Sequence, residues 1–297
     1  MLIDLHTHST ASDGTCTPAE LVTAAADAGL DVVAITDHDT TLGWAAAEAA
    51  LPSGLTLVRG AELSCRWYGA DPYAHSGSRT SSGEPEQAPI ALHLLAYLFD
   101  PGYEPLAMEL RRVREAREHR AEAMIDLLRA DGIDVTWDEV REAAAGGTVG
   151  RPHVAQALIR RGLVDTVSEA FAPRWLGQRY RLPKADIDVF RALELVLAAG
   201  GVPVFAHPRA SVRGRIVPDS LIVELAHAGL AGLGADHEDH TPRQRAEVRA
   251  LAAELGLFVT GSSDFHGTNK TVKLGAQTTA PEAYERIVTA ARGVGPV

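Results

Sequence analysis

Short apolar runs that end in a histidine or a carboxylate recur along most of this chain, and they limit the folds open to it. Leu2–Leu5 leads into His6-Thr7-His8, and Val32–Ile35 leads into Thr36-Asp37-His38-Asp39. Later runs end at Glu62, His93, His207 and Ser263-Asp264-Phe265-His266. Side chains alternate along a strand, so His6 and His8 share a face, and residues at the ends of several strands can converge at one mouth of a barrel. The pattern therefore predicts a multinuclear metal site at one end of a barrel-like sheet.

The chain also alternates strand patterns with helix patterns. Thr17 as a cap, Pro18 at the first helical position and Glu20 three residues after the cap predict a helix start, and Gly29 predicts its end. We expect strands at 2–6, 31–36, 55–61, 90–97, 202–206, 230–235 and 257–261, and helices at 18–28, 41–50, 186–199, 218–228, 242–255 and 281–292. About seven strands, mostly parallel by the right-handed crossover rule, favour an α/β barrel.

The middle of the chain has a different pattern. Residues 104–129 are heavily charged with apolar positions at helical spacing, and 137–145 and 153–161 predict shorter helices around a Gly-rich joint. We therefore expect a helical insertion lobe at 104–181, and a barrel made of 1–103 and 182–297. Gly69–Pro89 is rich in Gly, Ser and Pro, which predicts a flexible surface loop with a solvated His75.

Charge and cysteine content narrow the class of protein. The formal net charge of −11 over 297 residues argues against binding a long nucleic acid through a basic surface. It leaves room for a small anionic substrate, because bound metals can reverse the local field. No secretory segment or membrane-spanning run is apparent, so we expect a cytoplasmic protein without membrane contact. Cys16 is either a thiolate ligand or a small structural residue, and it forms no CxxC pair with Cys65.

Each histidine taken singly has a structural explanation, but nine His, Asp and Glu residues at strand ends do not. Buried charges are costly unless they are paired or bind a metal. Imidazole together with carboxylate suits Zn, Mn or Fe better than an all-oxygen Mg or Ca site. Asp37 and Asp39 either orient a ligand from behind or cap the following helix.

These motifs resemble, in order and over essentially the whole chain, those of the PHP (polymerase and histidinol phosphatase) family. The chain is most similar to the bacterial phosphoesterases of that family that act on nucleotide phosphates, whose helical insertion carries a Gly-Arg-Pro-His segment, here Gly150-Arg151-Pro152-His153. The resemblance implies a distorted (β/α)7 barrel with a helical insertion lobe that contributes to substrate binding. The stretch before His93 is longer than this resemblance leads us to expect.

The resemblance also implies up to three divalent metal ions, with manganese expected and zinc, iron or magnesium as alternatives. It assigns nine residues as catalytic metal ligands: His6, His8, Glu62 and Asp264 for one metal, Glu62, His93 and His207 for a second, and Asp13, His38 and His266 for the third.

Arg151 is the main candidate for substrate binding outside these ligands. It opens a helix after Gly-rich residues, where backbone N–H groups favour anions, and its guanidinium can bind phosphate bidentately. The alternative is a surface arginine. His240 is expected to touch phosphate or to protonate the leaving oxygen, with His237 as its rival, unless both are plain loop surface. Weaker candidates for a cationic rim are Arg179, Arg181, Lys184 and Arg209.

Phosphate ester hydrolysis fits such a metal site, because metal ions lower the pKa of bound water and can stabilise both the attacking and the leaving oxygen. The leading expectation is a phosphoesterase for small nucleotides, either nucleoside 3′,5′-bisphosphates or AMP, with short oligoribonucleotides as a related substrate. Histidinol phosphate is the alternative substrate. From another class, the alternative is a metal-binding nucleotide sensor that does not hydrolyse its ligand.

Overall fold

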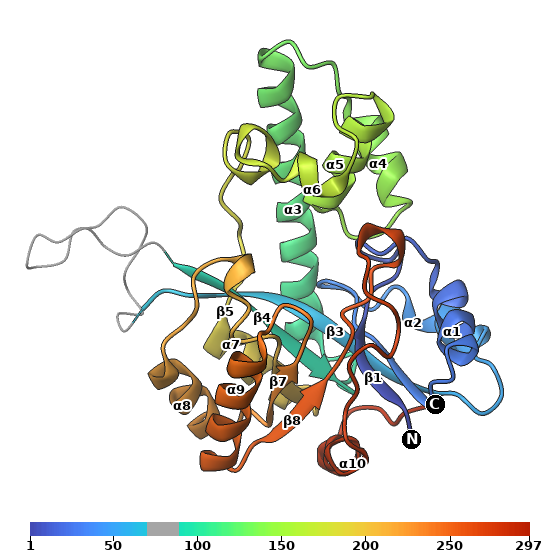
Figure 1. Ribbon diagram of the computed structural model, residues 1–297, viewed down its shortest axis with the longest axis vertical. Helices are drawn as coiled ribbons and strands as arrows, with labels where there is room; N and C mark the ends of the chain where they lie inside the picture. The colour runs from blue at the N-terminus through green and yellow to red at the C-terminus, as the bar shows by residue number, and fades with distance from the viewer. Residues whose placement is uncertain (70–88) are drawn as a thin grey trace, which may run out of the picture.

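The computed structural model describes residues 1–69 and 89–297. It has two parts, a barrel in the lower half of Figure 1 and a group of helices standing above it. Apart from its two end residues, the predicted loop Gly69–Pro89 lies outside the described residues, and so does His75.

An eight-stranded sheet forms the barrel wall. Its strands are β1 (Ile3–Thr7), β2 (Val32–Ile35), β3 (Thr56–Trp67), β4 (Ile90–Tyr97), β5 (Ile187–Asp188), β6 (Val202–Phe205), β7 (Gly232–Asp236) and β8 (Phe258–Gly261). Seven of them follow the order β1-β2-β3-β4-β6-β7-β8, and the short β5 pairs with β3 outside this path. A parallel bridge from Thr7 to Phe265 brings the first and last strands together. The predicted distorted (β/α)7 barrel is confirmed.

Two features of the sheet differ from the sequence expectation. β4 runs antiparallel to both β3 and β6, whereas the other pairs are parallel. An antiparallel pair needs no helical crossover, and no helix separates β3 from β4 in the described residues. β5 has only two residues, too few for a periodic pattern to reveal it.

Ten α-helices accompany the strands in the described residues. They are α1 (Pro18–Asp27), α2 (Trp44–Ala49), α3 (Glu104–Ala130), α4 (Trp137–Ala144), α5 (Arg151–Arg160), α6 (Val167–Ala170), α7 (Val189–Ala198), α8 (Asp219–His227), α9 (Pro242–Glu254) and α10 (Pro281–Ala290). α1 begins as expected, because the Thr17 hydroxyl accepts a hydrogen bond from the Glu20 backbone N–H and the Glu20 side chain bonds the Thr17 backbone in return. α6 has no counterpart among the expected helices.

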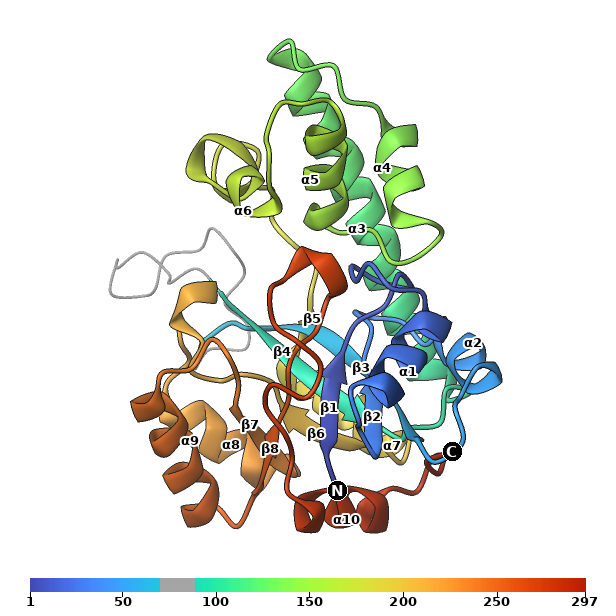
Figure 2. The same cartoon turned by 45° about the vertical axis from the view of Figure 1, so that its right-hand side comes forward.

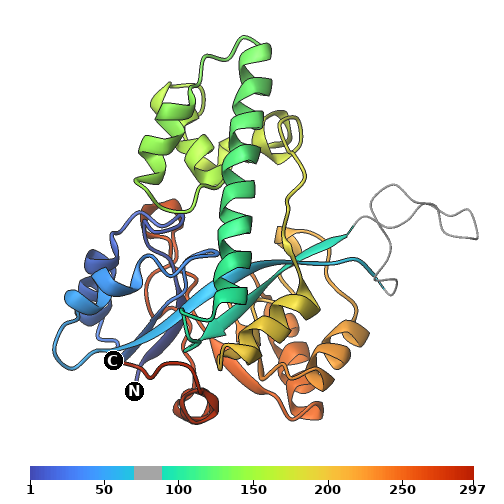
Figure 3. The same cartoon turned by 180° about the vertical axis from the view of Figure 1, so that it is seen from behind.

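The long helix α3 joins the two parts of the molecule, as Figure 3 shows from behind. Its first half places Leu106, Leu110 and Val113 in the barrel core. Its second half packs in a separate core together with α4, α5 and α6. The second half of α3 and the helices α4 to α6, which we call the lobe, therefore share an apolar interior of their own that runs from Ala121 to Tyr180. The bounds 104–181 remain a prediction of the sequence.

The two ends of the barrel are different. Residues of β2 alternate between two apolar layers, with Val32 and Ala34 in one and Val33 and Ile35 in the other, so this strand is buried on both faces. α10 covers the end of the barrel away from the lobe, where Ile287 packs in the same apolar layer as Val32 and Ala34. The carboxyl ends of the parallel strands point toward the lobe, as does the amino end of the antiparallel β4 (Figure 2). No helix of the described residues is long and apolar enough to cross a membrane.

Candidate metal centre

The structure brings the nine candidate ligands together at the end of the barrel that faces the lobe, where Glu62 lies within β3 and His93 within the antiparallel β4. His6, His8, Glu62 and Asp264 are at most 1 % exposed, and His207 and His266 are also buried. His207 and Asp264 have positive φ angles of 35° and 54°, which non-glycine residues seldom adopt. Such backbone strain is concentrated at functional sites, because it persists only where the surrounding structure holds it.

Glu62 lies at the middle of the group. Its Oε2 is 3.1 Å from Nε2 of both His6 and His8. Its Oε1 is 2.7 Å from Nδ1 of His93 and 3.1 Å from Nε2 of His207. Burial raises the pKa of Glu62, but His6, His93 and His38 outweigh it and hold that pKa well below the usual range. Glu62 is therefore an anion that can bridge two cation sites.

Asp264 completes a first ligand group with His6, His8 and Glu62, since their ligand atoms all lie within 4.8 Å of one another. Its Oδ1 is 3.4 Å from His6 Nε2 and 3.3 Å from His8 Nε2.

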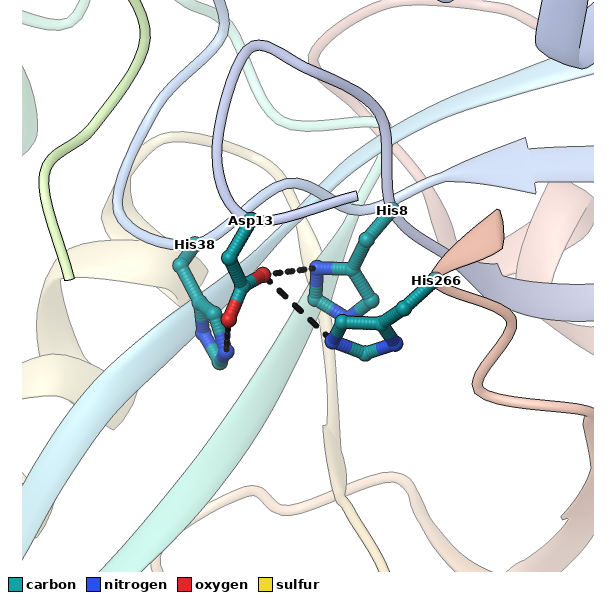
Figure 4. Close-up of side chains that lie close together, drawn as sticks. All are labelled: His8, Asp13, His38 and His266. Carbon is teal, nitrogen blue, oxygen red and sulfur yellow. Dashed lines mark ion pairs between the residues drawn. The ribbon is translucent and has the colours of Figure 1, made fainter. Parts of the chain in front are cut away.

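Asp13 is at the middle of a second group, shown in Figure 4. Its Oδ1 is 3.7 Å from His8 Nδ1 and 3.4 Å from His266 Nε2, and its Oδ2 is 3.8 Å from His38 Nε2. His8 thus turns one ring nitrogen toward each of the two groups. The sequence had placed only His38 and His266 with Asp13, and did not include His8 in this second group.

A third group is formed by His38, Glu62 and His93. The sequence grouping placed His207 there instead of His38. His207 does lie near Glu62, but its Nε2 is also 3.1 Å from the guanidinium of Arg213.

The chemistry of these donor atoms fits bound cations. His6 and His8 turn their Nε2 atoms toward each other at 3.0 Å. Two buried atoms of this centre, His38 Nδ1 and Asp264 Oδ1, have no hydrogen-bond partner among the described residues. Burial lowers the pKa of His8, but hydrogen bonds to Asp264 and Glu62 outweigh it and raise that pKa to about 10. Buried carboxylates are stable only next to positive charge, and divalent ions between them would supply that charge.

Comparisons with known proteins agree with this geometry. Residues 4–135 match the model of the PHP domain. The chain is 34% identical to a 5′-3′ exoribonuclease from Haemophilus influenzae, over 92% of each chain. The protein belongs to the PHP family.

Two further relatives support the placement in this family. A 3′,5′-nucleoside bisphosphate phosphatase from Chromobacterium violaceum is 31% identical, over 89% of this chain and 87% of that protein. The crystal structure of a protein described as a metal-dependent phosphoesterase, from Bifidobacterium adolescentis, superposes with a TM-score of 0.85 at 33% identity, over 98% of this chain and 96% of that one. The chain is thus a PHP-family phosphoester hydrolase, and the family and the ligand groups together support divalent-metal binding.

Three side chains beside the candidate ligands were not assigned by the sequence, or only as an alternative. Arg213 Nη2 and Lys270 Nζ donate to Asp264 Oδ2 at 2.5 and 2.6 Å, and His237 Nε2 lies 3.2 Å from the same oxygen. Burial raises the pKa of Asp264, but Lys270 and Arg213 outweigh it and hold that pKa well below its usual range. A clue to Arg213 in the sequence is the run Ser211-Val212-Arg213-Gly214-Arg215, which follows a strand end.

His240 is not brought to the metal centre. Its Nδ1 donates to the Ala235 carbonyl at 2.7 Å, and its Nε2 accepts a hydrogen bond from the Arg209 backbone N–H at 3.0 Å. Both ring nitrogens are therefore engaged by the backbone, and contact with a phosphate would break one of these bonds. Its rival His237 is the residue that faces Asp264.

Asp37 and Asp39 do something other than either role considered for them. Asp37 accepts hydrogen bonds from the Ser9 backbone, the Ser9 hydroxyl and the Ser12 hydroxyl, so it holds the loop that carries Asp13. Asp39 accepts from the Ser64 backbone at 2.7 Å and pairs with Arg117 of α3 at 2.7 Å.

Cys16 belongs to none of the ligand groups among the described residues. It packs against the barrel core, and burial raises the pKa of its thiol. The structural explanation of Cys16 is the one that this placement supports.

A cavity of about 530 Å³ lies between the metal centre and the lobe. Asp13, His38, His93, His207 and His266 line it on the barrel side. Eight Arg and Lys side chains also line it. Five of them come from α3, α5 and the segment after the lobe, and we call these five the cationic wall: Arg117, Arg120, Arg151, Arg181 and Lys184. Two other predicted rim residues are not in its lining, because Arg179 pairs with Asp131 and Arg209 pairs with Asp219.

The cationic wall has an excess of positive charge. Burial, together with Arg181 and Arg117, lowers the pKa of Arg151 to about 10. Burial likewise lowers the pKa of Lys184 to about 8, with Arg117, Arg120 and Arg151 adding to the effect. Asp186 raises the pKa of Lys184, but this carboxylate pairs with Arg66 at 3.7 Å. Cations that disfavour one another's charged form in this way favour the binding of an anion.

Proposed function

We propose that this PHP protein removes phosphate from small nucleotides, namely nucleoside 3′,5′-bisphosphates or AMP, and shortens small oligoribonucleotides at the same site. The observation that carries the proposal is the shared cavity, which has the metal ligands on one side and the cationic wall on another. A substrate with two separated negative groups can contact both sides at once.

The nine ligands would hold divalent metal ions, which supply Lewis acidity and a water of lowered pKa for attack on phosphorus. Glu62 would join two of the ion positions, because its two oxygens face different histidines. Asp264 would be held in place by its contacts with His237 and Lys270. Imidazole and carboxylate ligands suit manganese, and manganese remains a prediction of the sequence.

Arg151 is the residue proposed to bind the second phosphate or the phosphate backbone. It opens α5 at the cavity, its guanidinium lies 4.9 Å from the ring centre of Phe171, and its Nη1 donates to the Leu176 carbonyl at 3.2 Å. These contacts orient the guanidinium and leave other N–H groups for an oxyanion. Arg117 already donates hydrogen bonds to Asp39 and to the Ser64 hydroxyl. Arg120, Arg151 and Lys184 would therefore contribute most of the binding of the substrate anion.

The overall negative charge of the protein fits a short substrate. Positive charge is concentrated inside the cavity, whereas the chain as a whole has a formal net charge of −11. A long nucleic acid would be repelled outside the cavity, while a nucleotide or the end of a short strand would be attracted into it. A cytoplasmic location also remains a prediction of the sequence.

The test is phosphate release from 3′,5′-bisphosphoadenosine, AMP, a short oligoribonucleotide and histidinol phosphate, each with Mn²⁺, Mg²⁺, Zn²⁺ or a chelator. Release from the nucleotides should require metal, disappear in His8→Ala and weaken in Arg151→Ala. A preference for histidinol phosphate would replace the nucleotide proposal by its alternative. Failure to hydrolyse any of the four substrates with any metal would contradict it.

A further inference from the structure

The loop that carries Asp13, residues 9–14, is in direct contact with the helical lobe. The Thr148 backbone N–H donates to the Ala11 carbonyl at 2.8 Å. At Gly147 a Cβ atom would lie 2.2 Å from the Thr10 carbonyl oxygen and 2.8 Å from the Ala11 backbone, so the approach requires glycine. In Figure 2 the loop appears in blue beneath the lower ends of the lobe helices.

His153 makes a second contact between the lobe and this loop. Its side chain is 2 % exposed. The Gly150 backbone N–H donates to its Nδ1 at 2.9 Å, which leaves the proton on Nε2. Burial lowers the pKa of His153, whereas Asp13 and the Ser12 backbone raise it, so the ring lies beside the loop that carries Asp13. A buried histidine of the lobe is therefore packed next to this loop.

Other elements hold the loop from the remaining sides. The Asn269 side chain donates to the Asp13 carbonyl at 2.9 Å, and Gln156 of α5 is 3.5 Å from Asn269. Asp37 binds the Ser12 hydroxyl at 2.6 Å. The loop is thus held between the lobe, the turn after His266 and the end of β2.

We propose that the lobe is a structural part of the metal centre, with Gly147 and His153 acting as positioning residues for Asp13. Asp13 supplies the carboxylate of the group it forms with His8, His38 and His266. The three histidines follow strand ends, whereas Asp13 depends on a loop whose position the lobe helps to set. The group of His6, His8, Glu62 and Asp264 contains no such loop residue. Loosening the lobe should therefore weaken one ion position and spare the others, an inference that rests on the metal-dependent function proposed above.

The experiment measures metal per chain after loading the full-length protein with Mn²⁺ and removing free ion, together with Mn²⁺ affinity by calorimetry. Gly147→Ala and His153→Ala are compared with the wild type and with Gly295→Ala, a matched control at a glycine with open surroundings. His153→Gln is the conservative variant, because glutamine at this helix position can accept from the Gly150 N–H and donate toward Ser12.

We expect Gly147→Ala and His153→Ala to bind about one ion fewer, or to bind the weakest ion roughly 10–100-fold less tightly, as for other residues that position ligands. His153→Gln should recover most of the loss, and Gly295→Ala should match the wild type. Melting temperatures identify any variant that fails to fold, in which case the other variant of the pair Gly147→Ala and His153→Ala decides. Unchanged ion number and affinity in folded variants, with only a raised KM, would overturn the proposal and leave the lobe a purely substrate-binding part. A wild type that binds no divalent ion would instead contradict the proposed function.

Discussion

The metal centre and the cationic wall face one cavity, but they are built from different kinds of side chain. The metal centre uses short, buried imidazoles and carboxylates at strand ends, and the backbone at His207 and Asp264 is strained. The cationic wall uses long arginine and lysine side chains from α3, α5 and the segment that follows the lobe.

This difference matches the two tasks. An ion needs several donor atoms at fixed short distances, so its ligands must have little conformational freedom. An anionic substrate can be bound by long side chains that adapt to its length. We therefore expect changes in the metal centre to abolish activity, and changes in the cationic wall to alter the affinity for substrate.

The strongest test of this contrast is Glu62→Gln. Glu62 contacts several imidazoles, and loss of its charge removes the anion that bridges the ion positions. We expect a loss of kcat of about 10³-fold, by analogy with the removal of one strong electrostatic contact from an active site, together with reduced metal content. Steady-state kinetics and metal analysis measure both effects. The control is Glu104→Gln, which removes the charge of an exposed glutamate that pairs with Arg111. Full activity in Glu62→Gln would remove the basis of the proposed metal centre.

Arg151→Lys tests the cationic wall. Lysine keeps the charge but loses the two-pronged contact with an oxyanion and the stacking on Phe171. We expect KM for a nucleoside bisphosphate to rise about 100-fold, the upper end for hydrogen bonds to charged groups, with metal content unchanged. Arg160→Lys is a matched control at the other end of α5, where the side chain is 49% exposed. A fall in metal content would break the proposed division between the two regions.

His237→Gln tests a contact behind the ligands. The Asp239 backbone N–H donates to His237 Nδ1 at 3.0 Å, which leaves Nε2 to donate to Asp264. We expect about a tenfold loss of metal affinity, the smaller end of the range for residues that orient ligands. Titration with Mn²⁺ gives the value, and the exposed His227→Gln is the control. An effect on KM alone would place His237 with the substrate instead.

The smallest expected effect is a pH dependence from Lys184. Its pKa is lowered to about 8, so the side chain is cationic below that pH and becomes neutral above it. We expect KM for a nucleotide to rise roughly fivefold as pH increases through this value, because one ion pair at a solvent-accessible site contributes up to about 1 kcal/mol. In Lys184→Arg the rise should move to higher pH, and in Lys184→Met it should vanish. If KM still rises with pH in Lys184→Met, the titrating group is not Lys184.

Many local features could be predicted from the sequence. The expected strand at 90–97 is β4, and the expected helix at 104–129 is α3 but for one residue at its end. The helix start at Thr17 was also predicted, because a capping box depends on neighbours three residues apart. The direction of β4 and the pairing of β5 were missed, since strand direction depends on the path of the chain rather than on local periodicity.

From the order of its motifs the sequence already predicted a PHP barrel with nine candidate metal ligands. The folded chain shows in addition that His8 faces two groups, that His38 joins Glu62 and His93, and that Arg213 and Lys270 contact Asp264. It also decided that both ring nitrogens of His240 are held by the backbone. The physical reason is that strand and helix patterns are encoded by near neighbours in the chain. The direction of a side chain at a strand end is set instead by the register of the sheet and by contacts with distant segments.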